Sequence, residues 1–217
     1  MALESAHLFE EISHLAITDG LTGLYNVRHM KRVLGEEVKR SVRYARPLSF
    51  IMLDIDFFKA YNDMHGHPRG DEVLRILAGL LQQNTRAVDS VVRSGGEEFS
   101  VLIPVVSRQE AYSMAERIRR VVQDHVFPYE EDQPEGNLTV SMGVASLPED
   151  AQDGEELIER ADRALYRAKQ TGRNRVCLYE PELEDRPAPV IYLQPSDEKK
   201  APQTVDPPRG GKPAGDA

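Results

Sequence analysis

The feature that most constrains the fold is a pair of adjacent glycines between two apolar runs. Gly95-Gly96 lies between Val91–Arg93 and Phe99–Val105. Because glycine tolerates positive φ, a two-glycine link of this kind predicts a β-hairpin, with the two runs as antiparallel strands. A purely parallel, doubly wound sheet is therefore disfavoured.

Three further strands and four helices are expected around this hairpin. The strand-like apolar runs are Leu48–Leu53, Leu138–Val144 and Asn174–Tyr179. Apolar residues recur at helical spacing in segments 26–46, 70–84, 107–125 and 154–171. Asn26 and Ser107 are expected to cap two of these helices, and Glu110 completes a capping box with Ser107. The sequence predicts an α+β fold, a central, mixed and largely antiparallel five-stranded sheet flanked by helices.

The chain divides into three parts. Apolar residues near helical spacing predict an amphipathic helix over residues 1–17. Residues 18–180 are expected to form one folded domain. Residues 181–217 hold eight of the chain's 14 prolines, many charges and little apolar periodicity, so they are predicted to be a disordered tail.

The first residues contain neither a basic leader nor a continuous apolar segment, so they do not resemble a secretion signal. No apolar run approaches the roughly 20 residues that a membrane-spanning helix needs. We therefore expect a cytoplasmic location without direct membrane insertion, which leaves a membrane-bound partner possible.

Charge and cysteine content exclude two classes of function. A formal net charge of -9 argues against general affinity for nucleic acid, because that affinity needs many cationic side chains to displace counterions from phosphates. Cys177 is the only cysteine, so an intrachain disulfide and a cysteine-rich metal site are both excluded. A small anionic ligand remains possible through local basic clusters.

Acidic residues gather where two strands end. Glu97 and Glu98 follow the glycines, which lack Cβ atoms and let a bulky anion approach the backbone. Asp54 closes a buried strand and would stand beside the hairpin if these strands were neighbours. Asp54, Glu97 and a backbone carbonyl would suit Mg²⁺, which prefers hard oxygen ligands. Taken singly, these features have plainer interpretations. The glycines and the two glutamates could be a solvated hairpin tip, and Asp54 could cap a turn at the end of its strand. Asp56, two residues later, could be an acid at a helix start.

Segment 62–71 reads as a loop, because glycines and a proline interrupt two helical stretches. Asn62 and Asp71 could bind the edge of a purine there. A carboxylate accepts hydrogen bonds from N1–H and the N2 amine of guanine, whereas adenine has an unprotonated N1, so Asp71 favours guanine. Asp71 could equally be a helix N-cap. His65 and His67 have no third ligand at zinc-like spacing, so we reject a zinc site.

Cations surround a glycine near the end of the last helix. Lys169, Arg173 and Arg175 flank Gly172 and could contact a triphosphate. Basic residues also stabilise helix C-termini in general, and glycine commonly ends helices, so this cluster alone does not decide between the two roles.

Five motifs together resemble the GGDEF-domain family of diguanylate cyclases, across Asp19 to Val176. They occur in the family's order and spacing: D-G-L-T-G-L-Y-N from Asp19, D-I-D-F-F-K-A-Y-N-D from Asp54, G-H-P-R-G-D from Gly66, R-S-G-G-E-E-F from Arg93 and K-Q-T-G-R-N-R from Lys169. The resemblance implies a fold similar to the palm of polymerases and adenylate cyclases, in which the Gly95-Gly96 hairpin and the end of the Asp54 strand face one another. It also implies condensation of two GTP molecules into cyclic di-GMP, with release of pyrophosphate.

The resemblance assigns roles to the matched residues. Mg²⁺, or Mn²⁺, would be held by Asp54, the Ile55 carbonyl and Glu97, with Glu98 as an additional acid. Glu97 would also help to deprotonate the attacking 3′-hydroxyl, and Lys59 would stabilise charge on the transferred phosphoryl group. It also implies that Asn62 and Asp71 hold guanine and that Phe57, Phe58, Lys169 and Arg173 contact the phosphates. The loop residue His67 is expected near the nucleotide, and the open backbone at Gly95 and Gly96 near its phosphates.

Two positions depart from the family's usual pattern. Glu97 stands where the family name has aspartate, which retains the carboxylate and lengthens its reach by one methylene. Ser94 stands where a larger side chain is usual, which could loosen the packing of the hairpin but removes no reacting group.

A regulatory site is implied as well. Arg86-Ala87-Val88-Asp89 resembles the family's R-x-x-D site, where the product cyclic di-GMP binds and inhibits, and Arg117 falls where a second basic contact is often found. Without the resemblance, Arg86 and Asp89 read as a surface ion pair.

The resemblance also implies a homodimer. One domain binds one GTP, so two domains must face each other to supply both nucleophiles. The helix at residues 1–17 resembles a coupling helix, which implies activation by self-association or by a sensor or regulatory partner.

Two rival functions differ in their chemistry. A catalytically silent module that binds cyclic di-GMP or GTP would have no chemical need for Asp54, Lys59 and Glu97. A cyclase that makes an adenine-containing dinucleotide is disfavoured by Asp71, on the guanine argument above.

Overall fold

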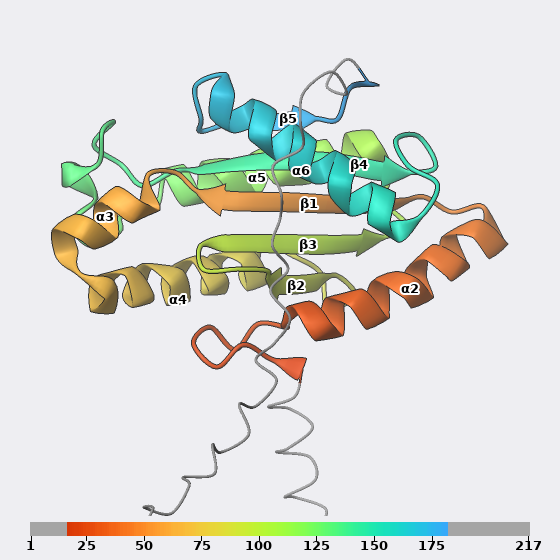
Figure 1. The fold of residues 1–217 in the computed structure, drawn as a ribbon, viewed down its shortest axis with the longest axis horizontal. Helices are drawn as coiled ribbons and strands as arrows, with labels where there is room; N and C mark the ends of the chain where they lie inside the picture. Colours follow the sequence, from red (N-terminus) through yellow and green to blue (C-terminus); the bar gives the residue numbers. More distant parts are fainter. Residues whose placement is uncertain (1–16, 182–217) are drawn as a thin grey trace, which may run out of the picture.

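A five-stranded sheet forms the centre of the protein, whose computed structural model describes residues 17–181 (Figure 1). Its strand order is β2-β3-β1-β4-β5. The strands are β1 (Leu48–Ile55), β2 (Ser90–Arg93), β3 (Glu98–Pro104), β4 (Val140–Leu147) and β5 (Val176–Leu178). All pairings are antiparallel except that of β4 with β5. The prediction of an α+β fold with a mixed, largely antiparallel sheet is confirmed.

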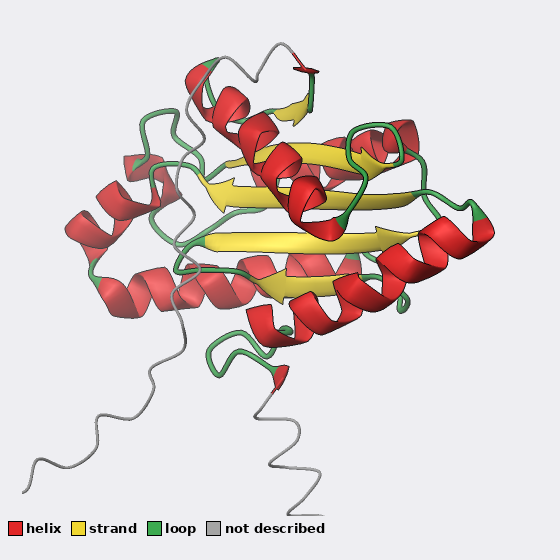
Figure 2. Cartoon of the chain, turned by 45° about the vertical axis from the view of Figure 1, so that its right-hand side comes forward, coloured by secondary structure: helices red, strands yellow, loops and turns green. Residues whose placement is uncertain are grey.

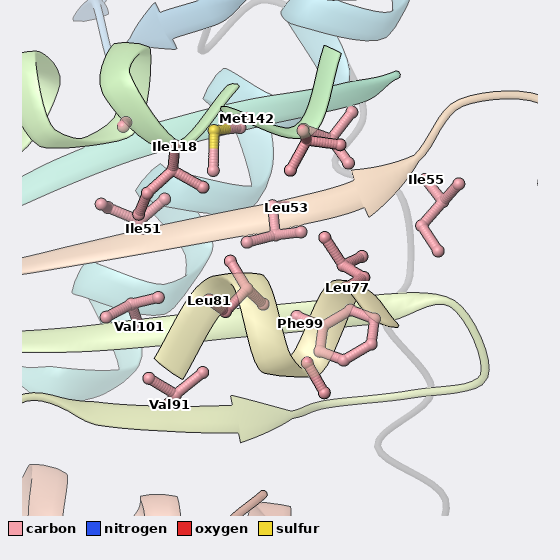
Figure 3. Packing of buried hydrophobic residues seen from close by; sticks show 14 of the residues in the cluster. Ile51, Leu53, Ile55, Leu77, Leu81, Val91, Phe99, Val101, Ile118 and Met142 are labelled. Carbon is pink, nitrogen blue, oxygen red and sulfur yellow. The ribbon is translucent and has the colours of Figure 1, made fainter. Parts of the chain in front are cut away.

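Helices cover both faces of the sheet (Figure 2). They are α2 (Val27–Tyr44), α3 (Phe58–His65), α4 (His67–Gln83), α5 (Arg108–Gln123) and α6 (Gly154–Gln170), with a short 3₁₀ turn η1 (Glu130–Asp132). Helices α4 and α5 pack on one face, where Leu77 and Ile118 meet Leu53 and Met142 (Figure 3). Helices α2 and α6 pack on the other face.

Strand β1 lies in the middle of the sheet and is buried on both sides, which explains its unbroken apolar run. Ile51 and Leu53 belong to the core under α4 and α5. Phe50 and Met52 belong to the core under α2 and α6. The central position of β1 places its carboxyl end, with Asp54, between β3 and β4.

Both predicted N-caps are present. The Asn26 side chain accepts a hydrogen bond from the His29 amide at 3.0 Å. Ser107 and Glu110 form both halves of a capping box at the start of α5. Because these contacts join residues that are close in sequence, the starts of both helices could be predicted from the sequence.

Segment 62–71 corrects the expectation of a loop. Helix α3, whose bounds were not predicted from the sequence, extends to His65 and meets helix α4 at Gly66, whose φ is 81°. Pro68 lies in the first turn of α4, where its missing N–H costs no intrahelical hydrogen bond. Asn62 and Asp71 are therefore both helical, and Asp71, well inside α4, is not its N-cap.

Helix α6 packs against β4 at very short range. A Cβ added to Gly143 of β4 would lie 2.1 Å from the carbonyl oxygen of Ala161 and 2.2 Å from the amide nitrogen of Leu165. Only a glycine lets the backbones approach this closely. The contact sets the position of α6, which carries Lys169 near its end.

The predicted N-terminal helix and the predicted tail lie outside the described residues, apart from Ile17 and Pro181. Across residues 17–181, none of the helices combines the length and the apolar character that crossing a membrane requires.

Candidate active site

Acidic residues from β1 and the hairpin come together at the carboxyl end of β1. Asp54 pairs directly with Glu98 in the register of β1 with β3, so the two acids lie on neighbouring strands. Asp54 is 5% exposed, and Glu97 and Glu98 are half-buried. The sequence could suggest this adjacency only through the family resemblance, because local patterns do not report which strands pair.

Burial and neighbouring charges shift the acids of this cluster. The pKa of Asp54 is raised to about 7, mainly by burial; the nearby Lys169 ammonium opposes this rise, while Glu97 and Glu98 add to it. The pKa of Glu97 is also raised, mainly by burial; the Glu98 carboxylate adds to this rise and the Lys169 ammonium opposes it. Lys169 Nζ lies 2.8 Å from Asp54 Oδ2. Asp54, Glu97 and Glu98 have one ammonium group, that of Lys169, close to them, so binding of a further cation among these acids would be favourable.

The oxygen atoms of this cluster could serve a divalent cation. Among residues 17–181, no three His, Cys, Asp or Glu side chains converge closely enough to hold a metal ion by themselves. Mg²⁺ commonly binds through one or two carboxylates and takes its other ligands from water and substrate phosphates. Asp54, Glu97 and the Ile55 carbonyl fit a cation of that kind, one completed by a phosphorylated substrate.

Asp162 of α6 is an acid of this region that the sequence reading missed. It is buried, and its pKa is raised to about 6, mainly by burial and also by Glu98, while Lys169 opposes the rise. Its sequence signal was an acid on the apolar face of α6, among Ala161, Ala164 and Leu165.

Arg93 fixes the geometry of the hairpin. Its Nη2 donates to the Gly96 carbonyl at 2.7 Å, and its Nη1 donates to Asp19 Oδ1 at 3.1 Å. Ser94 Oγ lies 2.8 Å from Ser100 Oγ, so this small residue is hydrogen-bonded in place. A Cβ on Gly95 would lie 2.6 Å from Glu98 Oε2, so a larger residue there would require the Glu98 carboxylate to move.

Helices α3 and α4 form a second part of the site. Asn62 Oδ1 is buried and has no hydrogen-bond partner within the described part of the chain. It lies against Gly70, where a Cβ would be only 1.9 Å away. Asp71 is half-buried one residue further along α4, and His67 is exposed at the start of that helix. An orphaned buried acceptor fits a ligand that brings its own N–H donors.

The first turn of α3 and the segment after α6 form the third part. Phe57 adopts a left-handed conformation with φ of 58°, Phe58 is buried, and Lys59 is exposed. The Arg173 guanidinium carbon lies 4.4 Å from the centroid of the Phe57 ring. Cationic side chains thus stand close to a helix N-terminus, whose free amides attract anions.

The predicted regulatory residues lie elsewhere. Arg86 binds Asp89 through two nitrogens, the closer contact being 2.7 Å from Nη2 to Oδ1. Arg117 donates to the side chain and the carbonyl of Asn84, both at 2.8 Å. Arg86 also lines a hollow of about 530 Å³ with Leu48, which is at the opposite end of β1 from Asp54.

Comparison with known proteins gives consistent matches. The sequence profile described as "Diguanylate cyclase, GGDEF domain" matches residues 16–175. The response regulator PleD of Caulobacter vibrioides is 44% identical over 162 residues, which cover 75% of this chain and 36% of PleD. The chain thus spans only about a third of the length of that relative.

Two solved structures share the fold. The coiled coil and GGDEF domain of DgcB from Caulobacter crescentus, in complex with c-di-GMP, has a TM-score of 0.75 and 30% identity over 82% of this chain and 93% of that one. The active GGEEF domain of a diguanylate cyclase from Vibrio cholerae has a TM-score of 0.66 and 37% identity over 71% and 97%. With a profile match that covers most of its length, the chain belongs to the GGDEF family of diguanylate cyclases.

Proposed function

We propose that this protein condenses two GTP molecules into cyclic di-GMP and releases two pyrophosphates. The observation that carries the proposal is the pairing of Asp54 with Glu98 at the end of β1. Glu97 raises the pKa of Asp54, and Lys169 forms an ion pair with it. The V. cholerae relative, described as active, also has a GGEEF motif, which supports a working glutamate at position 97.

The acids would hold a divalent cation and accept a proton. Asp54, Glu97 and the Ile55 carbonyl would hold Mg²⁺ or Mn²⁺, with Glu98 close by, and such a cation neutralises phosphate charge. Glu97 would take the proton of the 3′-hydroxyl as that oxygen bonds to the α-phosphate of the other GTP and pyrophosphate leaves. Burial, which raises the pKa of Glu97, makes this carboxylate a better proton acceptor.

The remaining contacts would orient GTP. Lys59, Lys169 and Arg173 would bind phosphate oxygens, together with the amides of Phe57 and Phe58 and the open backbone at Gly95 and Gly96. For Lys169 this requires leaving or sharing its contact with Asp54. Asn62 Oδ1 and the Asp71 carboxylate would accept the N–H groups of guanine, with His67 at the rim.

The active species would be a homodimer, because each domain supplies one guanine site and one nucleophile. A cytoplasmic location and control by a sensor or regulatory partner remain predictions. Nucleic acid is not an expected partner, given the net charge of -9.

The decisive test is incubation of the purified protein with GTP and Mg²⁺, followed by identification of the product. We expect cyclic di-GMP and pyrophosphate, at a rate per protein that rises with protein concentration as dimers form. Binding of cyclic di-GMP without turnover would favour the silent module. Incorporation of adenosine from mixed GTP and ATP would favour the rival cyclase, and no dinucleotide at any protein concentration would refute the proposal.

Gly70→Ala is expected to weaken GTP binding through Asn62. The added methyl group would occupy the space of Asn62 Oδ1 and push this side chain from its position. We expect KM for GTP to rise about tenfold, the effect of losing one good hydrogen bond to the base, with a smaller change in kcat. Gly79→Ala on the same helix, with nothing within 4 Å of the new Cβ, is the matched control. Equal KM values for the two variants would contradict a role of Asn62 in binding guanine.

Arg86→Ala is expected to relieve product inhibition. Arg86 lines two hollows of about 530 and 510 Å³, sizes typical of small-molecule sites. Losing its charged hydrogen bonds should raise the inhibitory concentration of cyclic di-GMP about tenfold or more, measured as initial rate against added product. Arg75→Ala, at an exposed position of α4, should leave inhibition unchanged. An Arg86→Ala enzyme as sensitive as the unmodified protein would show that this arginine does not bind the inhibitor.

A further inference from the structure

Asp56 makes a set of contacts that none of the roles above requires. Its side chain is 2% exposed. Oδ2 accepts hydrogen bonds from Thr139 Oγ1 at 2.8 Å and from the Asn174 backbone amide at 3.0 Å, while Oδ1 accepts one from Ser141 Oγ at 2.6 Å. The interpretation of Asp56 as a mere helix-start acid is therefore wrong: it joins the end of β1 to the start of β4 and to the segment after α6.

That segment, residues 172–175, is held in a strained backbone conformation. Arg173 and Asn174 have φ values of 59° and 45°, which lie in the left-handed region that residues other than glycine rarely adopt. Two such residues in succession persist only where surrounding contacts hold them. The Asp56 carboxylate supplies one of these contacts, at the amide of Asn174.

A second anchor holds the same residue from helix α5. Arg119 Nη1 donates to Asn174 Oδ1 at 2.7 Å and to Gln123 Oε1 at 2.6 Å. Asn174 Nδ2 in turn donates to Gln123 Oε1 at 3.2 Å. Asn174 is thus fixed through its backbone by Asp56 and through its side chain by α5.

We propose that Asp56 and Arg119 are positioning residues that lock segment 172–175, so that Arg173 is presented over Phe57 to the phosphates of GTP. The inference rests on the proposed function for the identity of the ligand. Arg173 immediately precedes the clamped residue, and its guanidinium lies 4.4 Å from the Phe57 ring centroid. Phe57 follows Asp56 directly, so one short stretch of chain holds both the clamp and the surface on which Arg173 rests.

The chemistry of the clamp separates two substitutions of Asp56. An asparagine side chain at this position could keep its oxygen toward the Asn174 amide and turn its NH₂ toward the Ser141 hydroxyl, which can accept as well as donate. Asp56→Asn should therefore preserve the lock. Asp56→Ala removes it and frees the strained segment.

The first test is limited trypsin digestion, with cleavage after Arg173 and Arg175 followed by mass spectrometry. Asp56→Ala should be cut there about tenfold faster than the unmodified protein, because proteolysis follows the population of locally opened chain. The control is Thr139→Val, which removes another hydrogen bond to Asp56 but leaves the bond to Asn174. Rates are compared at temperatures equally far below each variant's Tm, so that general destabilisation is cancelled.

The second test is binding and kinetics. In Asp56→Ala, the displacement of Arg173 should raise KM for GTP about tenfold, since small displacements of a substrate-binding group are costly. In Asp56→Asn, KM should stay close to that of the unmodified protein. Affinity for pyrophosphate with Mg²⁺, measured by calorimetry, should fall in parallel.

The outcomes separate cleanly. Equal cleavage and equal KM in Asp56→Ala and Thr139→Val would overturn the proposal and leave Asp56 a purely structural residue. If Asp56→Ala does not fold, Arg119→Met decides: faster cleavage after Arg173 supports the clamp, and an unchanged rate overturns it. Failure of the protein to make cyclic di-GMP would refute the proposed function, whereas the digestion test needs no turnover.

Discussion

Changing Glu97 to Gln is expected to lower the rate of cyclic di-GMP formation by about 10³-fold, the usual scale for losing a general base together with a charge at the reacting centre. The amide cannot take the proton of the 3′-hydroxyl and binds a divalent cation weakly. The same change removes one of the acids that raise the pKa of Asp54. Initial rates with GTP and Mg²⁺, read from the separated nucleotide product, give the measurement.

The control for this substitution is Glu155→Gln, at an exposed position in the first turn of α6. Its rate should stay within about twofold of the unmodified protein, as expected for a surface change away from the site. A Glu97→Gln enzyme that keeps more than a tenth of the activity would exclude Glu97 as the proton acceptor. Circular dichroism should show the same fold in both variants, because Glu97 is not a core residue.

Gly143→Ala is expected to lower the free energy of unfolding by about 3 kcal/mol, at the upper end of the usual range for overpacking. The new Cβ would meet the backbone of α6, at Ala161 and Leu165, and not a flexible side chain that could move aside. The helix must therefore shift away from β4, and Lys169 shifts with it. Urea denaturation followed by circular dichroism gives the free energy.

Gly35→Ala in α2 is the matched control for this prediction. Its Cβ would have nothing within 4 Å, so the substitution should stabilise the protein by about 0.5–1 kcal/mol through helix propensity alone. If Gly143→Ala were as stable as Gly35→Ala, the tight contact between β4 and α6 would not exist in solution.

The local parts of the fold were predictable because their causes lie close together in sequence. The hairpin follows from two glycines between apolar runs, and the start of α5 follows from Ser107 and Glu110, three residues apart. The break at Gly66 was misread as a loop, since Pro68 disrupts a helix interior but is harmless in a first turn. Pro68 was noticed in the sequence, but its effect on the helix depends on whether it lies in the first turn or in the interior.

The parts that could not be predicted depend on distant partners. Asp56 was interpreted as an acid at a helix start, yet its three donors lie 83, 85 and 118 residues away along the chain. The pairing of β1 with β3 depends in the same way on non-local contacts, and only the family resemblance implied that the hairpin faces the end of the Asp54 strand. The candidate metal and guanine residues were named from motifs, whereas the orphaned Asn62 Oδ1 and the closeness of Asp162 to Glu98 and Lys169 became visible only in three dimensions.

The two outer strands of the sheet, β2 and β5, are only four and three residues long. Tyr25 further covers β2, since its amide donates to the Val91 carbonyl at 3.2 Å and its carbonyl accepts from the Arg93 amide at 3.0 Å. Long, bare strand edges invite other chains to add to a sheet and aggregate. Copies of this protein at high local concentration are therefore not expected to join through their sheet edges, which would leave the proposed pairing of two domains free to reverse.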